Sequence, residues 1–346
     1  MTSVGRQNQN QPVSIKRHLF SIRSLASVLV ALGVLILLIT RFDIELGPTF
    51  SNIRQSNLAW FSLGLFTHYL GFVARGWRWH ILLNNVWDKN ENSTPSPTIW
   101  ACIRFIFLGS FANCVLGLRI GDAYRAYLIS ASNLTRASRA MGTILAERIL
   151  DMALVFFLLA GAALWVSSQG SFGLARVFVA ASFVLGLLGI LGLLTMWLFG
   201  LKLAQLLPKK IERLYATLHA GTLGSFQRIP WLLLLGVLAW MCEVGRLYCV
   251  IQALGYDLAI PMIVFVALAN ALLTTIPITP GGLGLVEPGV VGLLVLRFTR
   301  ESAVSTAFLD RAISYLSIVF IGGVFFFCRE VLARWLVRVR EKQERE

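Results

Sequence analysis

The sequence is poor in charged residues and in the clusters that build metal sites. Only 14% of its 346 residues are charged and 57% are hydrophobic, whereas a soluble domain has about 25% charged residues. The five cysteines lie in apolar segments without Cys-x-x-Cys spacing or paired histidines, so we expect small packing residues and no disulfide framework, metal site or cofactor: Cys102, Cys114, Cys242, Cys249 and Cys328. The composition predicts an integral membrane protein.

Acidic residues are also scarce, with 17 Asp and Glu against 31 Lys and Arg and a net charge of +14. The basic residues cluster beside hydrophobic segments, which is the pattern that membrane insertion and anionic lipid headgroups select. We therefore expect no nucleic-acid partner.

Long apolar segments predict a single membrane domain over residues 24–328 with six full transmembrane helices. Four charge-free segments and two that carry charges are long enough to span the membrane: 24–40, 58–74, 177–201, 312–328, 140–168 and 229–254. The basic tail 1–23 is predicted to be disordered and uncleaved. Lys and Arg counts place this tail and the 329–346 tail on the cytoplasmic side of the cell membrane. Residues 202–228 are predicted to form an amphipathic helix on the cytoplasmic face.

Two further apolar tracts are predicted to be re-entrant helical hairpins. Both flanks of 98–118 would be cytoplasmic, so this tract must return to the side it enters, with its turn at Gly109-Ser110. The tract 258–296 would enter from the opposite side and break at Pro277, Pro280 and the following glycines. Counting each tract as one span gives eight membrane segments by hydropathy.

Two segments 163 residues apart resemble each other and predict an inverted repeat. "AERILDMALVFF" (146–157) aligns with "LDRAISYLSIVF" (309–320), which places Glu147-Arg148 over Asp310-Arg311. With a change in loop length, Arg75 aligns with Arg246. The halves are about 24–168 and 177–328, and transporters with inverted repeats place broken helices and their site at the repeat interface.

Charges within these spans mark candidate functional positions. A charge near the bilayer centre costs about 2.5–3.5 kcal/mol on insertion scales, so these side chains should face the bundle interior: Glu147, Arg148, Asp151, Glu243, Arg246, Asp310 and Arg311. Residues three apart on a helix can neutralise each other, and we favour that interpretation for Glu243. We favour a functional role for the two acid–arginine doublets because they occur in both halves.

The segment "RIGDAYRAYL" (119–128) carries Arg119, Asp122 and Arg125 at intervals of three residues. One interpretation is an interfacial helix with solvated charges. The other is a site in which two guanidinium groups hold a phosphate and Asp122 orients one of them.

The segment "TPGGLGLVEPG" (279–289) places helix breakers and one carboxylate in a tract without other charge. Its backbone N–H groups could cradle an anion, its glycines could be packing contacts with Glu287 favourable in the first turn of a helix, or Glu287 could carry a proton. All three interpretations stay open. We predict that Pro280, Gly281, Gly282 and Gly284 border the site, with Glu287 near an arginine from the other half.

Five segments together resemble the successive motifs of one family: "ARGWRWHILL" (74–83), "RIGDAYRAYLI" (119–129), "ERILDMALVFF" (147–157), "PITPGGLGLVEPGV" (277–290) and "DRAISYLSIVFIGG" (310–323). They resemble the lysylphosphatidylglycerol synthase transmembrane-region family, also called flippase-like or UPF0104. The resemblance implies a protein that moves lipids between leaflets. The synthases carry a soluble aminoacyl-transfer domain after the last span, and only eighteen residues follow Cys328 here, so we expect no enzyme. Many relatives have Glu where this chain has Asp122.

We therefore expect an all-α integral membrane protein that binds an anionic phospholipid or polyprenyl-linked lipid headgroup in a central cavity. The candidate phosphate contacts are Arg75, Arg119, Arg125, Arg148, Arg246 and Arg311. The carboxylates expected to orient them or carry protons are Asp122, Glu147, Asp151, Glu287 and Asp310. No residue is predicted to be catalytic or to bind metal.

Other functions stay open at this point. A proton-coupled transporter of a small anion would use the same charges but enclose its site, whereas a lipid transporter needs a lateral gap for acyl tails. A subunit that presents lipid to a membrane lipid- or glycan-modifying enzyme is a further alternative. A second copy of the chain, or such an enzyme, are the protein partners left open.

Overall fold

The computed structural model describes residues 51–87, 96–116, 119–132, 135–168, 172–205, 208–275 and 279–325, and the regular structure in these ranges is helical. Five helices are long and apolar enough to cross a membrane. The prediction of an all-α integral membrane protein is thus confirmed. The predicted span 24–40, both predicted tails and Cys328 lie outside the described residues.

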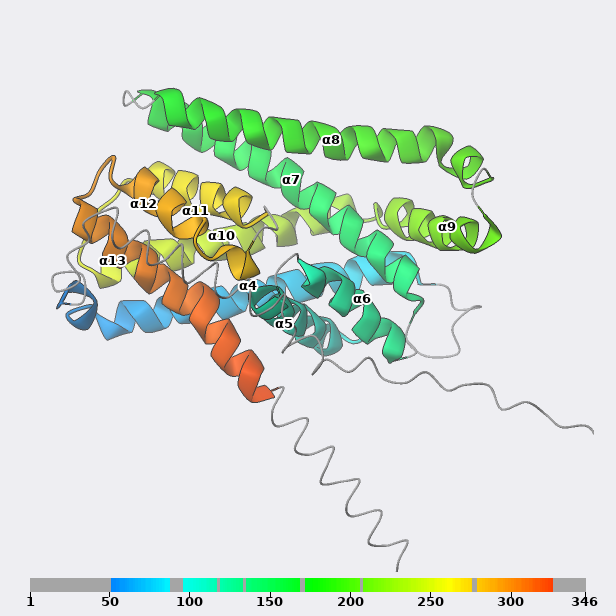
Figure 1. The fold of residues 1–346 in the computed structure, drawn as a ribbon, viewed down its shortest axis with the longest axis horizontal. Helices are drawn as coiled ribbons and strands as arrows, with labels where there is room; N and C mark the ends of the chain where they lie inside the picture. The colour runs from blue at the N-terminus through cyan, green and yellow to red at the C-terminus, as the bar shows by residue number, and fades with distance from the viewer. Residues whose placement is uncertain are drawn as a thin grey trace, which may run out of the picture.

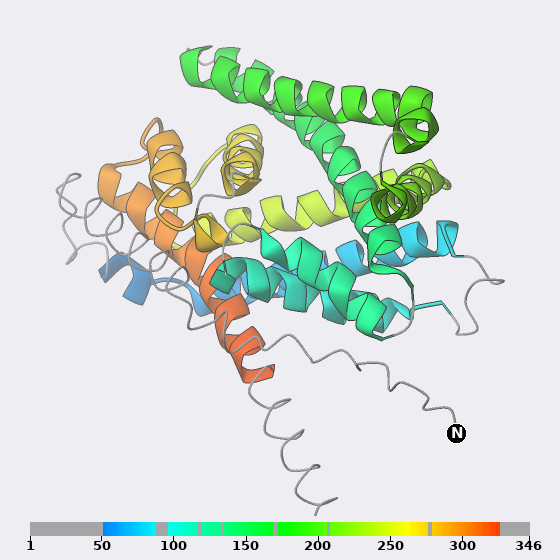
Figure 2. The ribbon, with the colours of Figure 1, turned by 45° about the vertical axis from the view of Figure 1, so that its right-hand side comes forward.

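The first four labelled helices are two long ones that flank a shorter pair: α4 (Leu58–Asn85), α5 (Ile99–Leu116), α6 (Ile120–Ala131) and α7 (Ala137–Ser168). Asn57 caps α4, since its side-chain oxygen accepts hydrogen bonds from the N–H groups of Ala59 and Trp60. In Figures 1 and 2, α5 and α6 lie together beside α4, while α7 crosses the bundle diagonally.

The remaining helices include a second series in the same order. They are α8 (Phe172–Gln205), α9 (Lys209–Gly224), α10 (Ile229–Ala253), α11 (Ile260–Thr275), the short 3-10 turn η1 (Pro280–Gly282), α12 (Val286–Leu294) and α13 (Arg300–Arg311). A π-helical segment, η2 (Ala312–Leu316), follows α13 directly and the helix then continues to Phe325. Long helix, shorter pair and long helix therefore occur twice, in α4–α7 and in α10–α13; the inverted orientation of these halves stays a prediction.

Helices α4 and α10 pack against each other along the bundle and run in opposite directions (Figures 1 and 2). Small residues make the close approach feasible: a Cβ atom placed on Gly64 would lie 3.2 Å from the Cβ of Cys249, and one on Gly71 would lie 3.4 Å from that of Cys242. Both cysteines are buried and free. Their predicted role as packing residues is confirmed.

The prediction for 98–118 is wrong in its turn position. Helix α5 continues through Gly109 and Ser110 without a break, and the chain reverses only between Leu116 and Ile120, so the hairpin consists of α5 and α6. Gly109 serves close packing and not a turn, because a Cβ on Gly121 would lie 1.9 Å from the Gly109 carbonyl oxygen. Since α5 alone is long enough to cross a membrane, its re-entrant character stays a prediction.

The tract 258–296 breaks where the prolines and glycines predict. Helix α11 ends at Thr275, η1 occupies Pro280–Gly282, and α12 begins at Val286. Gly281, Gly282 and Gly284 all have positive φ angles, of 57°, 74° and 79°, which glycine adopts without a steric penalty. Pro277 lies outside the described residues.

A small apolar cluster of Val250, Ala253, Leu309 and Ile313 and two large apolar cores hold the bundle together. One is built mainly by α4, α5, α6 and the first half of α7, and the other by the second half of α7 with α10–α13. Helix α8 packs on α7 and lies along the edge of the molecule in Figure 1. Only 6% of its apolar span is buried, as suits a helix that faces lipid. Helix α9, within the predicted 202–228 segment, packs closely on α7; its cytoplasmic position stays a prediction.

Candidate functional site

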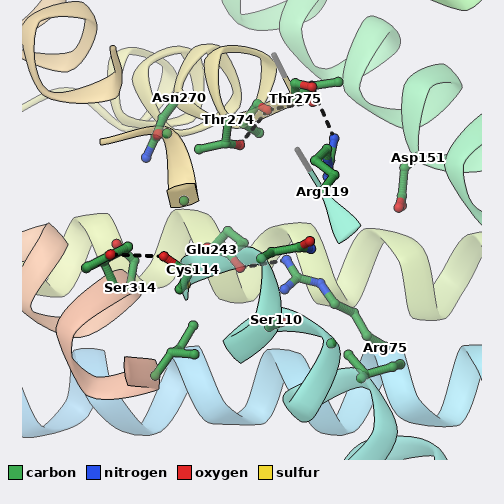
Figure 3. Close-up of a pocket in the computed structure, with 18 of the residues that line it drawn as sticks. Arg75, Ser110, Cys114, Arg119, Asp151, Glu243, Asn270, Thr274, Thr275 and Ser314 are labelled. Atoms are coloured by element: carbon green, nitrogen blue, oxygen red, sulfur yellow. Dashed lines mark hydrogen bonds and ion pairs between the residues drawn. The ribbon is translucent and has the colours of Figure 1, made fainter. Parts of the chain in front are cut away.

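A cavity of about 260 Å³ lies where the two apolar cores meet, and Figure 3 shows part of its lining. It is lined by residues from α4, α5, α6, α7, α10, α11, η1 and the end of α13 with η2. Most of the residues predicted for the site line it: Arg75, Arg119, Asp122, Arg125, Glu147, Arg148, Asp151, Arg246, Gly281, Gly282 and Arg311. Four predicted residues are not among the lining residues: Pro280, Gly284, Glu287 and Asp310.

Arg78 on α4 and Glu147 on α7 form the centre of a buried ion-pair network. Arg78 Nη1 lies 2.7 Å from Asp151 Oδ1, and Arg78 Nη2 lies 3.0 Å from Glu147 Oε1. Glu147 also accepts a hydrogen bond from Arg125, whose guanidinium carbon lies 4.3 Å from the centroid of the Trp79 ring. Burial of these charges is tolerated because each is paired.

A second network joins α4, α10 and α13. Arg246 Nε lies 2.8 Å from Asp310 Oδ1, and Arg246 also donates to Glu243. Glu243 Oε1 accepts from Arg75 Nη2 at 2.6 Å, so one carboxylate lies between an arginine of each half. The short-range neutralisation favoured for Glu243 and Arg246 is present.

Two further arginines are held by carboxylates from the neighbouring short helices. Arg148 donates from Nη2 to Asp122 Oδ1 at 2.7 Å, and Arg311 donates from Nε to Glu287 Oε1 at 2.7 Å. Two predictions are therefore wrong. Asp122 holds Arg148 and neither Arg119 nor Arg125, and Glu287 pairs with an arginine of its own half.

The ion pairs correct the alignment of the two halves. Arg78 binds the Glu147 carboxylate as Arg246 binds the Asp310 carboxylate, so Arg78, and not Arg75, corresponds to Arg246. Arg246 lies 168 residues after Arg78, and Glu243 lies 168 residues after Arg75. Arg75 and Glu243 therefore occupy corresponding positions in the two halves, and they also pair with each other. Arg78 was missed because Arg75, one helical turn earlier, offered an equally good match.

The backbone N–H groups of the glycine turn mainly donate hydrogen bonds to neighbouring acceptors of the protein itself, so few are free to bind an anion. Gly282 N–H donates to the Thr279 carbonyl, Leu283 N–H to that of Pro280, and Gly284 N–H to Glu287 Oε2 at 2.6 Å. Glu287 thus stabilises the start of α12 and holds Arg311 at the same time. These contacts favour the interpretation of the turn as a packing device, with Gly281 and Gly282 still at the cavity wall.

Arg119 differs from the other arginines of the cavity. It forms no ion pair within the described part of the chain, and the single hydrogen bond of its side chain there runs 3.5 Å from Nη1 to the Thr275 carbonyl oxygen (Figure 3). Its backbone φ of 51° is in the left-handed region, a conformation that costs a non-glycine residue about 1–2 kcal/mol. Such strain is typical of functional positions.

The charges around the cavity do not cancel. Together with the ion pairs behind its wall, which include Arg78, Glu287 and Asp310, the network holds seven arginines and six carboxylates: Arg75, Arg78, Arg119, Arg125, Arg148, Arg246 and Arg311 against Asp122, Glu147, Asp151, Glu243, Glu287 and Asp310. All six carboxylates are paired, so one positive charge remains, and it is that of Arg119.

Several neutral polar groups of the wall were missed from the sequence. The atoms His68 Nε2, Asn270 Oδ1, Thr279 Oγ1 and Ser314 Oγ are buried without a hydrogen-bond partner in the described structure, and all four residues line the cavity. Buried polar atoms are seldom left unpaired. Uncharged residues in apolar segments gave no signal; the π-helical segment that carries Ser314 is a feature often found at functional sites.

This arrangement defines a class of protein: a multi-pass, all-helical membrane protein whose interior holds a paired arginine–carboxylate network around a cavity with one positive charge in excess. Residues 24–322 match the family described as lysylphosphatidylglycerol synthase transmembrane region. The chain belongs to that family, as its motifs predict.

Curated relatives are archaeal. The chain is 31% identical over 227 residues to a UPF0104 membrane protein of Methanocaldococcus jannaschii. These aligned residues cover 64% of this chain and 94% of the relative. A UPF0104 membrane protein of Methanothermobacter thermautotrophicus is 26% identical over 327 residues, covering 85% and 91%. One of Pyrococcus horikoshii is 22% identical over 329 residues, covering 86% and 95%. These names describe membrane proteins and state no activity.

Proposed function

We propose that this protein binds the anionic headgroup of a membrane lipid in its cavity and carries that lipid between the leaflets of the cell membrane. The observation that supports this proposal best is Arg119, a cavity-lining guanidinium without a carboxylate partner among the described residues. Arg119 is partly buried, and a charge removed from water is normally paired. An anion that enters the cavity would supply the missing partner.

The neighbouring arginines suit the same role. Arg148 and Arg75 keep 33% and 25% of their side chains exposed within their ion pairs, whereas Arg78 keeps 1%. Donors not used by the carboxylates can therefore reach a phosphate, and guanidinium groups bind phosphate with paired hydrogen bonds. Asp122 and Glu243 hold these two arginines in place.

Lipid is favoured over a soluble anion because the chain belongs to a membrane family whose description names an enzyme that modifies a lipid. The protein is embedded in its proposed substrate, so a headgroup need only leave the interface and enter the bundle. Glu147, Asp310 and their arginines then act as a fixed frame, while Arg119 makes the contact that changes when the substrate binds.

The test is transfer of a fluorescent anionic phospholipid between leaflets of liposomes that contain the full-length protein. Arg119→Gln should lower the transfer rate at least about tenfold, since a charge-assisted hydrogen bond to the phosphate contributes roughly 1.5–3 kcal/mol. Arg104→Gln is the matched control, because Arg104 is an exposed arginine of α5 that does not line the cavity. Transfer by Arg119→Gln at the wild-type rate would contradict the proposal, and uptake of glycerol phosphate with no lipid transfer would assign the cavity to a soluble anion.

A further inference from the structure

We infer that the cavity selects a headgroup of one chemical class, a singly charged phosphodiester whose outer part carries uncharged hydroxyl groups. The inference rests on the proposed function and narrows it. It also excludes, for this chain, a headgroup to which an amino acid has been added, although the family description names lysylphosphatidylglycerol.

The first argument concerns the net charge of the ion-pair network around the cavity. Arg119 is the single excess positive charge of the network, since all six carboxylates are paired with other arginines. A phosphodiester carries one negative charge and neutralises this excess. A phosphomonoester can carry a second negative charge, which has no counterpart in this network.

The carboxylates give the second step. Esterification with lysine adds two ammonium groups and changes the headgroup charge from −1 to +1. An ammonium group in a buried site needs a carboxylate or several acceptors. In the described structure every carboxylate of the network already accepts from at least one guanidinium group, so an ammonium bound there would share its carboxylate with an arginine and be repelled by that positive charge.

The unpartnered neutral groups give the third step. Arg246 Nη1 lies 3.2 Å from His68 Nδ1; since a guanidinium can only donate, Nδ1 accepts and the proton of the neutral ring is on Nε2. His68 Nε2 is thus a buried donor without a partner, and the unpartnered Asn270 Oδ1, Thr279 Oγ1 and Ser314 Oγ belong to residues that line the same cavity. Together they offer both donors and acceptors without charge, which is what a hydroxyl group needs.

Two of the neutral groups, those of Asn270 and Ser314, lie apart from Arg119 (Figure 3). In Figure 3, Asn270 and Ser314 lie toward one end of the cavity, while Arg119 and Arg75 lie toward the other. A headgroup with its phosphate at Arg119 would therefore extend its outer part toward Asn270 and Ser314. This placement explains why polar side chains are kept in the apolar helix α11 and in the π-helical segment after Arg311.

Binding to the full-length protein in detergent tests the inference with four probes that have defined headgroups. These are short-chain phosphatidylglycerol, phosphatidylmethanol with the same charge but no hydroxyl, lysylphosphatidylglycerol, and tail-free glycerophosphoglycerol. We expect phosphatidylglycerol to bind about tenfold more tightly than phosphatidylmethanol or lysylphosphatidylglycerol, as one or two neutral hydrogen bonds predict. Equal affinity for phosphatidylmethanol, or tighter binding of the lysyl lipid, would overturn the inference.

Variants separate the inference from the proposed function. The double change Asn270→Leu with Ser314→Ala should abolish the preference for phosphatidylglycerol over phosphatidylmethanol, while Arg119→Gln should weaken the binding of both lipids. Thr195→Val is the control, as Thr195 is exposed on α8. A double variant that keeps the preference would overturn the inference alone. Failure of every lipid to bind the wild-type protein would overturn both, and equal binding of glycerophosphoglycerol would overturn the lipid assignment alone.

A gain-of-function change keeps the test informative if the double variant does not fold. Asn270→Asp differs from the wild type by one group and adds a carboxylate to the wall. It should reverse the order of affinities, so that lysylphosphatidylglycerol binds more tightly than phosphatidylglycerol. A folded Asn270→Asp protein that retains the wild-type order would show that Asn270 does not face the headgroup and would overturn the inference.

Discussion

Replacing Arg119 with glutamine should make the protein more stable while it stops lipid transfer. The side chain is held in the cavity wall without an ion pair among the described residues, and its hydrogen bond to the Thr275 carbonyl is 3.5 Å long. The other arginines of the network are held by carboxylates, so the same change at the buried Arg78 should have the opposite sign. Stability and function are expected to oppose each other at this one position.

The magnitude follows from two opposing contributions. A charge near the bilayer centre costs about 2.5–3.5 kcal/mol on insertion scales, and the neighbouring carboxylates and the partial exposure of Arg119 reduce that cost. The long hydrogen bond to Thr275 contributes less than about 1 kcal/mol. We therefore expect Arg119→Gln to stabilise the folded protein by about 1–2 kcal/mol. Arg119→Gly should add about 1 kcal/mol more, because glycine adopts a φ of 51° without strain.

Thermal unfolding of the purified protein in lipid-free detergent measures this difference. Arg119→Gln should raise the melting temperature by about 2 °C or more, and Arg119→Gly should raise it further. Added phosphatidylglycerol should stabilise only the wild type, because ligand binding stabilises the state that binds it. A lower melting temperature for both variants would show that Arg119 has a structural partner and would refute the reasoning.

Two further predictions concern the frame around the cavity. Glu147→Gln should destabilise the protein by about 3–5 kcal/mol, because it breaks buried ion pairs with Arg78 and Arg125. Asp122→Asn should cost about 1 kcal/mol or less, because the side chains of the Arg148–Asp122 pair are 33% and 22% exposed. Equal melting temperatures of the two variants would contradict this prediction. Gly121→Ala should prevent assembly of α5 and α6, since its Cβ would lie 1.9 Å from the Gly109 carbonyl oxygen. Gly186→Ala on α8 has nothing within 4 Å of its Cβ and should be neutral or stabilising by about 0.5–1 kcal/mol. Gel filtration in detergent distinguishes a folded from an aggregated Gly121→Ala protein.

The sequence sufficed for the parts of the fold that depend on composition and on strong helix breakers. Apolar length predicted the membrane class and the spans that became α7, α8 and α10, and Pro280 with its glycines located the break before α12. The turn of the first hairpin could not be located in this way. Gly109 and Ser110 are tolerated within α5, and the actual reversal has no proline.

The site was predictable where charge stands out against an apolar background. Arg119, Arg148 and Arg311 line one cavity as expected, although they come from three segments of the chain. Partner assignment failed for Asp122, because helix spacing gives neighbours on one helix and this carboxylate pairs across to α7. The partner of Glu287 was expected in the other half, whereas Arg311 belongs to the same half. Neutral residues such as Asn270 have no such contrast, and only an unpartnered atom in a folded structure reveals them.

The arginines of α4 are synthesised well before the carboxylates that pair with them. Arg78 finds its carboxylates on α7, 69 and 73 residues later, and Arg75 finds Glu243 on α10, 168 residues later. At roughly 5–20 residues per second, the ribosome needs about 8–34 s to reach Glu243 after Arg75. During that interval α4 carries a charge that lipid does not accept, so it must wait at the membrane surface or beside the insertion machinery until α10 emerges.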